Sequence, residues 1–156
     1  MDDEILYLTN RLDAEGKKTL EFFASLADEQ FNKPIYSDGA TWNIRQVLAH
    51  FVATETAILD LLREIVQGGK GTPDGFNLDQ YNQARVHELD YAPVTTLLQE
   101  YGKRRDLLSA FVGNLSAADL ARTGIHPFLG QTDVENIVKL VYRHNQIHIR
   151  EIRKFL

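Results

Sequence analysis

Two histidines near the end of the chain, His144 and His148, have the spacing of a metal-binding pair. Four residues apart on a helix, they lie on adjacent turns with Cβ atoms about 5–6 Å apart, within reach of one ion. They fall on the apolar face of a helix predicted over residues 134–156, formed by Val134, Ile137, Val141, Ile152 and Phe155. Each ring nitrogen left unpaired on such a face costs about 1–3 kcal/mol. The two residues are therefore either metal ligands or buried histidines that are hydrogen-bonded to neighbours.

A further candidate ligand and a candidate proton carrier lie on a helix predicted over residues 41–67, with Thr41 as its N-cap. His50 lies at the edge of the apolar face of this helix, where a single histidine is more typical of a boundary residue than of a ligand. Glu55 lies on the flank of the same face. A carboxylate there is expected either to be partly exposed or to assist proton transfer beside a metal site.

A glycine-rich connection and a short helix that carries a candidate catalytic residue follow this helix. Residues 67–75 are rich in glycine, but they lack the GxxxxGK[ST] order of a phosphate-binding loop, and a helix rather than a strand precedes them. Asn77 is the expected N-cap of a short helix that ends near residue 88 and carries Tyr81. This helix either covers a pocket or lies on the surface without contributing to a site. His126, in a loop at residues 126–130, is expected to be solvated.

Composition limits the chemistry and the partners. The 156 residues include no cysteine, which excludes disulfides, thiolate ligands and cysteine nucleophiles. The formal net charge of −5 disfavours binding to nucleic acid. The acidic first residues lack the character of a signal peptide, and no apolar run reaches the length of a membrane span. We expect a cytoplasmic protein that binds neither nucleic acid nor membranes.

The elements that must position these residues are four long amphipathic helices. They are predicted at residues 2–29, 41–67, 93–114 and 134–156, with a break around Pro34 and Ser37-Asp38-Gly39 that makes residues 30–40 a connection. Short extra helices are predicted at residues 77–88 and 116–124, and capping boxes begin at Ser116 and Thr132. No strand pattern alternates with these helices. The sequence predicts one all-α domain over residues 1–156, a four-helix bundle.

The chain resembles the DinB-like superfamily, which includes transferases dependent on bacillithiol or mycothiol. The resemblance extends over nearly the whole chain. It rests on TWNIRQVLAH at residues 41–50 and HNQIHIREI at residues 144–152, with similar segments FNLDQYN at 76–82 and HPFLG at 126–130. It implies a DinB-like bundle in which His50, His144 and His148 bind a divalent metal, zinc or nickel. Asn145 stands where members of the group often have aspartate, at a position that points away from the ligands.

The resemblance implies a function in two alternative classes. The first is a metal-dependent S-transferase or hydrolase in which the ion, with at least one open coordination position, activates water or a low-molecular-weight thiol. Glu55, Tyr81 and Glu151 are then the candidate catalytic residues, and a homodimer is expected. The second is a non-catalytic bundle, with or without metal, that has a structural or stress-related role.

Overall fold

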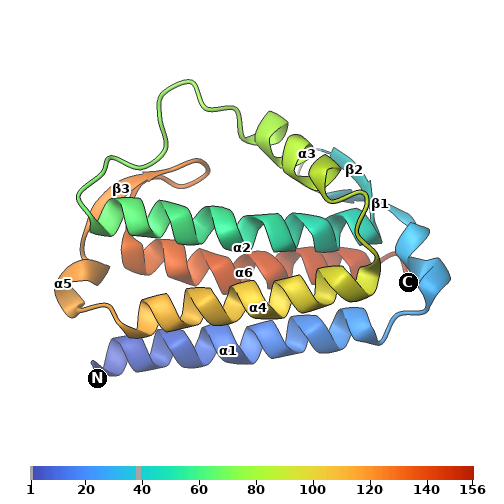
Figure 1. The fold of residues 1–156 in the computed structure, drawn as a ribbon, viewed down its shortest axis with the longest axis horizontal. Helices are drawn as coiled ribbons and strands as arrows, with labels where there is room; N and C mark the ends of the chain where they lie inside the picture. Colours follow the sequence, from blue (N-terminus) through green and yellow to red (C-terminus); the bar gives the residue numbers. More distant parts are fainter. Residues whose placement is uncertain (1, 38–39) are drawn as a thin grey trace.

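Four long helices lie side by side and form the body of the molecule, as expected. The computed structural model describes residues 2–37 and 40–156. The long helices are α1 (Asp3–Ala24), α2 (Ile44–Val66), α4 (Val94–Gly113) and α6 (Val134–Arg153). Helices α1 and α2 each pack against α4 and α6, so α1 and α2 occupy opposite corners of the bundle. Figure 1 shows α1 and α6 running in one direction and α2 and α4 in the other.

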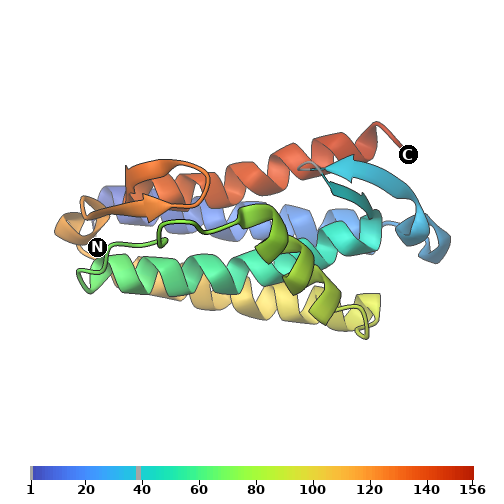
Figure 2. The ribbon, with the colours of Figure 1, turned by 90° about the horizontal axis from the view of Figure 1, so that it is seen from above.

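The long connection between α2 and α4 follows from this arrangement. Because the two helices are parallel neighbours, the chain must return along the bundle before α4 begins. It does so through the loop after residue 66 and the short helix α3 (Leu78–Glu88), which crosses above α2 in Figure 2. As predicted, Asn77 caps α3, accepting a hydrogen bond from the backbone N–H of Gln80. This return segment places α3 over one face of the bundle.

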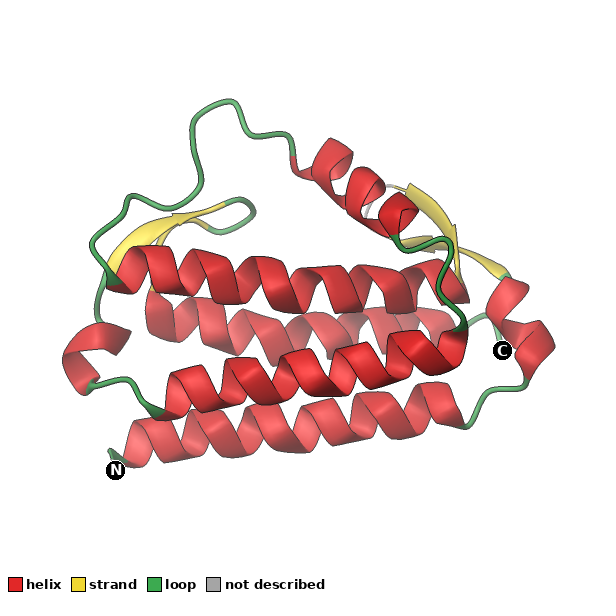
Figure 3. Ribbon diagram, in the orientation of Figure 1, coloured by secondary structure: helices red, strands yellow, loops and turns green. Residues whose placement is uncertain are grey.

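Two antiparallel strand pairs, which were not predicted from the sequence, lie near opposite ends of the bundle, on the side where α3 lies (Figure 3). The first pairs β1 (Pro34–Ser37), which follows a short 3₁₀ helix, η1 (Asp28–Asn32), with β2 (Ala40–Asn43). Strand β1 lies in the predicted connection, whereas β2 extends into the predicted second helix. Of the predicted break, Asp38 and Gly39 lie outside the described residues. The second pairs β3 (Thr123–His126) with β4 (Gly130–Asp133) after the short helix α5 (Ala117–Leu120). With strands of only four residues, neither hairpin has a period long enough to be recognised.

The predicted start of α2 and the predicted end of the first helix both move, and the cap of α6 changes. Trp42 pairs with Ile35 in β2, so α2 begins later than expected and is capped by Asn43 in a capping box with Gln46. As predicted, α6 begins at Val134, but its N-cap is Asp133, and Thr132 pairs with Gly124 in β4. The first helix ends at Ala24 instead of near residue 29, since η1 follows it. The capping box at Ser116 is confirmed, with Asp119 as its partner.

The core consists of two apolar clusters, one toward each end of the bundle. Between them lies a belt of buried polar residues contributed by all four long helices, namely Glu15, Thr19, His50, Glu55, Arg105, Ser109, Asn145 and His148. Burying polar groups is costly unless they are paired, so this belt must be stabilised by specific contacts. In residues 2–37 and 40–156, no helix has a stretch long and apolar enough to cross a bilayer.

Candidate metal centre

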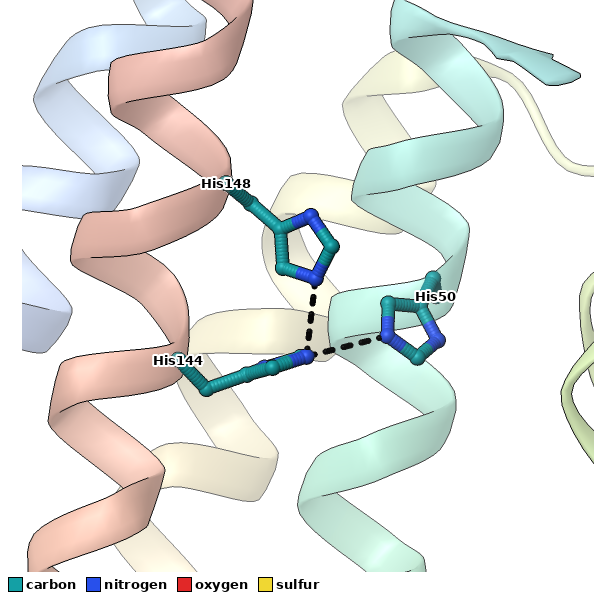
Figure 4. A group of neighbouring side chains, drawn as sticks. All are labelled: His50, His144 and His148. Carbon is teal, nitrogen blue, oxygen red and sulfur yellow. Dashed lines mark hydrogen bonds between the residues drawn. The ribbon is translucent and has the colours of Figure 1, made fainter. Parts of the chain in front are cut away.

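The three predicted ligands converge on one point between α2 and α6. The Nε2 atom of His144 lies 3.1 Å from Nε2 of His50 and 2.9 Å from Nε2 of His148. Figure 4 shows the rings of His144 and His148 reaching from α6 toward that of His50 on α2. One nitrogen of each ring belongs to a group whose members all lie within 4.8 Å of one another. His50 is buried rather than at the boundary of its helix, with 3% of its surface exposed.

This arrangement fits a metal ion better than it fits hydrogen bonds among the rings. A neutral imidazole nitrogen offers either one proton or one lone pair, yet Nε2 of His144 faces two other ring nitrogens. A cation accepts a lone pair from all three. Bonds of about 2.0–2.1 Å in a tetrahedral zinc site place neighbouring ligand nitrogens about 3.3 Å apart, close to the separations seen here. The donor set suits zinc, and imidazole also suits nickel.

Aromatic rings surround the histidines on the protein side. The ring of Phe51 lies 5.7 Å from that of His144 and 5.5 Å from that of His148. Trp42, placed by the first hairpin, lies 5.0 Å from the ring of His50 and is also buried. These apolar neighbours hold the rings in place and exclude water from the side of the site that faces the core.

The other side of the histidines opens into a cavity of about 660 Å³ between α2, α6, α3 and the second hairpin. All three histidines line it. Its walls are mostly apolar, including Ala53, Ala57, Leu61, Leu140, Val141 and Ile147 from the two long helices and Phe76 and Phe128 from the covering segments. A cavity of this size and character accommodates a small molecule next to the ion position.

A backbone contact fixes the cover of this cavity. The N–H of Thr72 donates to the carbonyl of Ile125 at 2.8 Å, and the N–H of Ile125 donates to the carbonyl of Lys70 at 2.9 Å. Gly71 lies between these two bonds with φ of +90°, and a Cβ there would come within 2.5 Å of the Ile125 carbonyl oxygen. Only glycine fits so close an approach at this backbone conformation. The loop after α2 is thereby attached to β3.

The three candidate catalytic residues lie in different surroundings. Tyr81 lines the cavity, with its ring 5.3 Å from that of Phe76. Glu55 is buried in the core rather than partly exposed, and it forms an ion pair with Arg105. Glu151 is half-buried, and its Oε2 atom has no hydrogen-bond partner among residues 2–37 and 40–156. In the described part of the chain, neither Glu55 nor Glu151 is among the residues that line the cavity.

The surroundings of His126 differ from those predicted from the sequence. It was expected to be solvated in a loop, but it ends β3, is 5% exposed and lines the cavity. Burial, with a smaller contribution from His144, lowers the pKa of His126 to about 4. The sequence held no clear signal for this burial, because Gly124 and His126 turn inward through the alternation of β3, a strand of only four residues.

Asn145 points away from the histidines, as predicted, and contacts α1 and α4 instead of α2. Its Nδ2 donates hydrogen bonds to the Tyr101 hydroxyl on α4 and to Oγ1 of Thr19 on α1. Burial raises the pKa of Tyr101 to about 12, so its hydroxyl keeps its proton. These bonds fix the rotation of α6 about its axis and thereby direct His144 and His148 toward α2.

Comparison with known proteins places the fold in a family. The family model of the DinB superfamily matches residues 11–152. The chain belongs to the DinB superfamily. No curated protein sequence matches it. Among solved structures, YfiT from Bacillus subtilis shares the fold with a TM-score of 0.78 at 18% sequence identity. The match covers 99% of this chain and 87% of YfiT, which is described as a probable metal-dependent hydrolase with an unusual four-helix bundle topology.

Two further structures share the fold at lower identity. The mycothiol-dependent maleylpyruvate isomerase has a TM-score of 0.78 at 10% identity, and the match covers 97% of this chain but 63% of the isomerase, which is therefore substantially longer. The colibactin self-resistance protein ClbS, solved in complex with a dsDNA, has a TM-score of 0.73 at 13% identity over 97% of this chain and 96% of that one. At these identities the comparisons establish the DinB-like four-helix bundle and no more.

Proposed function

We propose that this DinB-like protein is a divalent-metal-dependent enzyme that activates water or a low-molecular-weight thiol, in a reaction of the hydrolase or S-transferase type. One observation carries the proposal. Three histidine Nε2 atoms from α2 and α6 converge at the wall of a cavity large enough for a small molecule. A closed structural site would have four protein ligands, whereas three histidines leave a position open toward the cavity.

Each residue of the site has a separate role in this proposal. His50, His144 and His148 would hold the ion, zinc or nickel, which supplies a Lewis acid that lowers the pKa of a coordinated water or thiol. Phe51 and Trp42 pack against the ligand rings on the side of the core, and the three histidines line the cavity on the other side. Tyr81 contacts the substrate from α3. The description of YfiT as a probable metal-dependent hydrolase supports hydrolysis, and the description of the isomerase as mycothiol-dependent supports the use of a low-molecular-weight thiol.

The first experiment tests the ligand set. Zinc is titrated calorimetrically into metal-free protein and into the variants His50→Ala, His144→Ala and His148→Ala. Each variant is expected to bind zinc at least about tenfold more weakly, because a three-ligand site loses one of its bonds. The matched control is His87→Ala, since the His87 side chain is 84% exposed and pairs with Asp90 on the surface. Equal affinity in the wild type and all three variants would refute the site.

The second experiment tests for an open coordination position. Cobalt(II)-loaded protein is titrated with a small neutral thiol, and the near-ultraviolet absorption that arises when a thiolate binds cobalt is recorded. We expect this absorption in the wild type and its loss in His148→Ala. A cobalt spectrum that shows four protein ligands and does not respond to thiol would favour the alternative, a non-catalytic bundle that the metal merely stabilises.

A further inference from the structure

His126 has a fixed tautomer. Its Nδ1 atom accepts two backbone hydrogen bonds, from the N–H of Phe128 at 3.0 Å and from the N–H of Leu129 at 3.1 Å. An atom that accepts hydrogen bonds carries no proton, so in the neutral ring the proton must be on Nε2. The same two donors would oppose a proton on Nδ1, and so they act against the imidazolium form. His126 is therefore a neutral ring with one N–H group, held by the loop of the second hairpin.

The Nε2–H group of His126 is available to a ligand. The ring lines the same cavity as His50, His144 and His148, although it is not a member of their metal-binding group. Among the described residues, no hydrogen bond is made to His126 Nε2, while Nδ1 makes two. A hydrogen-bond donor in a largely apolar cavity is more selective than one at the surface, because leaving it unpaired on ligand binding is costly.

The charges around the cavity restrict what that ligand can be. The ionisable residues that line it, apart from the histidines and Tyr81, are Glu64 and Asp79, and both are exposed acids. Within the described residues, the lining includes no lysine or arginine. An anionic group would meet negative potential at the rim and no cation inside the cavity other than the ion itself. The apolar walls favour a ligand with a largely apolar surface, and His126 favours a ligand that carries one acceptor oxygen.

We propose that His126 donates its Nε2–H to an acceptor oxygen of the substrate, and that the cavity accordingly takes a neutral, largely apolar molecule carrying a carbonyl-type oxygen. This proposal rests on the proposed function for the ion at the three histidines. It assigns His126 a role in selecting the substrate: a neutral donor stabilises a carbonyl oxygen without adding a charge to the cavity. A neutral histidine with a lowered pKa can act in this way throughout the neutral pH range.

The test uses two neutral thiols that differ in an amide group, and the comparison of wild type with a His126 variant isolates the part of the difference that is due to His126. Mercaptoacetanilide carries an amide carbonyl between its thiol and its phenyl ring, whereas phenylpropanethiol has the same chain length and ring with methylene groups in place of the amide. Both can bind zinc through sulfur. We expect the zinc-loaded wild type to bind mercaptoacetanilide about five- to tenfold more tightly, the increment of one hydrogen bond in a cavity.

The variant His126→Asn removes the donor and keeps the loop. Asparagine can still accept a backbone N–H two residues ahead, as His126 does from Phe128, but its side chain is too short to reach the place of Nε2. We expect this variant to bind zinc with unchanged affinity and to lose the preference for mercaptoacetanilide, with its affinity for phenylpropanethiol unchanged. His87→Asn is the matched control and should keep the preference.

Nitrogen-15 NMR of the zinc-loaded wild type gives a readout that requires no variant. The His126 ring should show the tautomer protonated on Nε2, and its Nε2–H signal should shift when mercaptoacetanilide is added but not when phenylpropanethiol is added. A proton on Nδ1, or equal preference for the amide in the wild type and His126→Asn, would overturn the role of His126. If neither thiol binds the zinc-loaded wild type, the proposed thiol chemistry of the metal site fails as well, and the two failures are thereby distinguished.

Discussion

Glu55 and Arg105 form an ion pair at the centre of the bundle, with Nε of Arg105 donating to Oε1 of Glu55 at 2.6 Å. Both side chains are 3% exposed. Burial raises the pKa of the Glu55 carboxyl, and the neighbouring Arg105 opposes that rise. Arg105 also donates from Nη1 to the carbonyl of Leu12 at 2.9 Å, so it links α4 to both α2 and α1. This pair is the centre of the polar belt between the two apolar clusters.

Removing one partner of this pair should be far more costly than removing one partner of a surface pair. Arg105→Met leaves the Glu55 carboxylate buried without a counter-ion, and we expect the free energy of unfolding to fall by about 3–5 kcal/mol. Arg63→Met, which breaks an exposed pair with Asp60, should cost less than about 1 kcal/mol. Urea denaturation near neutral pH measures both. A loss below 1 kcal/mol for Arg105→Met would show that the pair is not buried in solution.

Gly16 makes room for the same arginine. A Cβ at Gly16 would lie 2.9 Å from Cγ of Arg105, whose guanidinium is held by Glu55 and by the Leu12 carbonyl. Gly16→Ala should therefore destabilise the protein by about 1–3 kcal/mol, despite the usual helical preference for alanine. Gly102→Ala on α4 is the control, because its nearest neighbour is Cδ1 of Leu20 at an ordinary 3.4 Å. That variant should gain up to about 1 kcal/mol. Equal effects of the two substitutions in urea denaturation would show that Gly16 is not needed to make room for Arg105.

His126 should make stability depend on pH. Its pKa is lowered from 6.5 to about 4 in the folded protein, so between these values the unfolded chain binds a proton that the folded chain does not. The free energy of unfolding must then fall as the pH is lowered through this window. Metal-free wild type should lose more stability than metal-free His126→Asn between about pH 7 and about pH 5, measured by urea midpoints. Parallel losses in the two proteins would mean that His126 titrates normally.

Metal should stabilise the fold through all three histidines. An ion that binds only the folded chain, present at about a hundredfold excess over its dissociation constant, adds about 2.7 kcal/mol. For a chain of this size, that corresponds to a rise in melting temperature of roughly 5–11 °C. Scanning calorimetry with zinc and after chelation should show this rise in the wild type and much less of it in His50→Ala. The same rise in both proteins would place the stabilising ion elsewhere.

The long helices and the metal ligands could be predicted from the sequence because both depend on regular spacing. The apolar period gives α1, α2, α4 and α6, and the i, i+4 spacing of His144 and His148 places them on one face. The inclusion of His50 depended on the resemblance to a family, since nothing in its own helix brings it toward α6. The geometry now shows His50 beside His144, which spacing within one helix could not reveal.

The hairpins and the polar belt could not be predicted, for different physical reasons. Four-residue strands carry too little pattern, so Thr41 appeared to be a helix cap although it pairs in β2. The partner of Glu55 is 50 residues away on another helix, and Arg105 has no local signature that marks it as buried. The fixed tautomer of His126 depends on backbone N–H groups whose directions only the folded hairpin sets.

X-ray absorption spectroscopy at the zinc edge of the metal-loaded protein tests the metal centre most directly. We expect one zinc per chain, with three imidazole nitrogens at about 2.0–2.1 Å and one further light atom that is not from a histidine. In His144→Ala the imidazole contribution should decrease or the zinc should be lost. A spectrum without imidazole scattering, or one that His144→Ala leaves unchanged, would contradict a metal site at His50, His144 and His148.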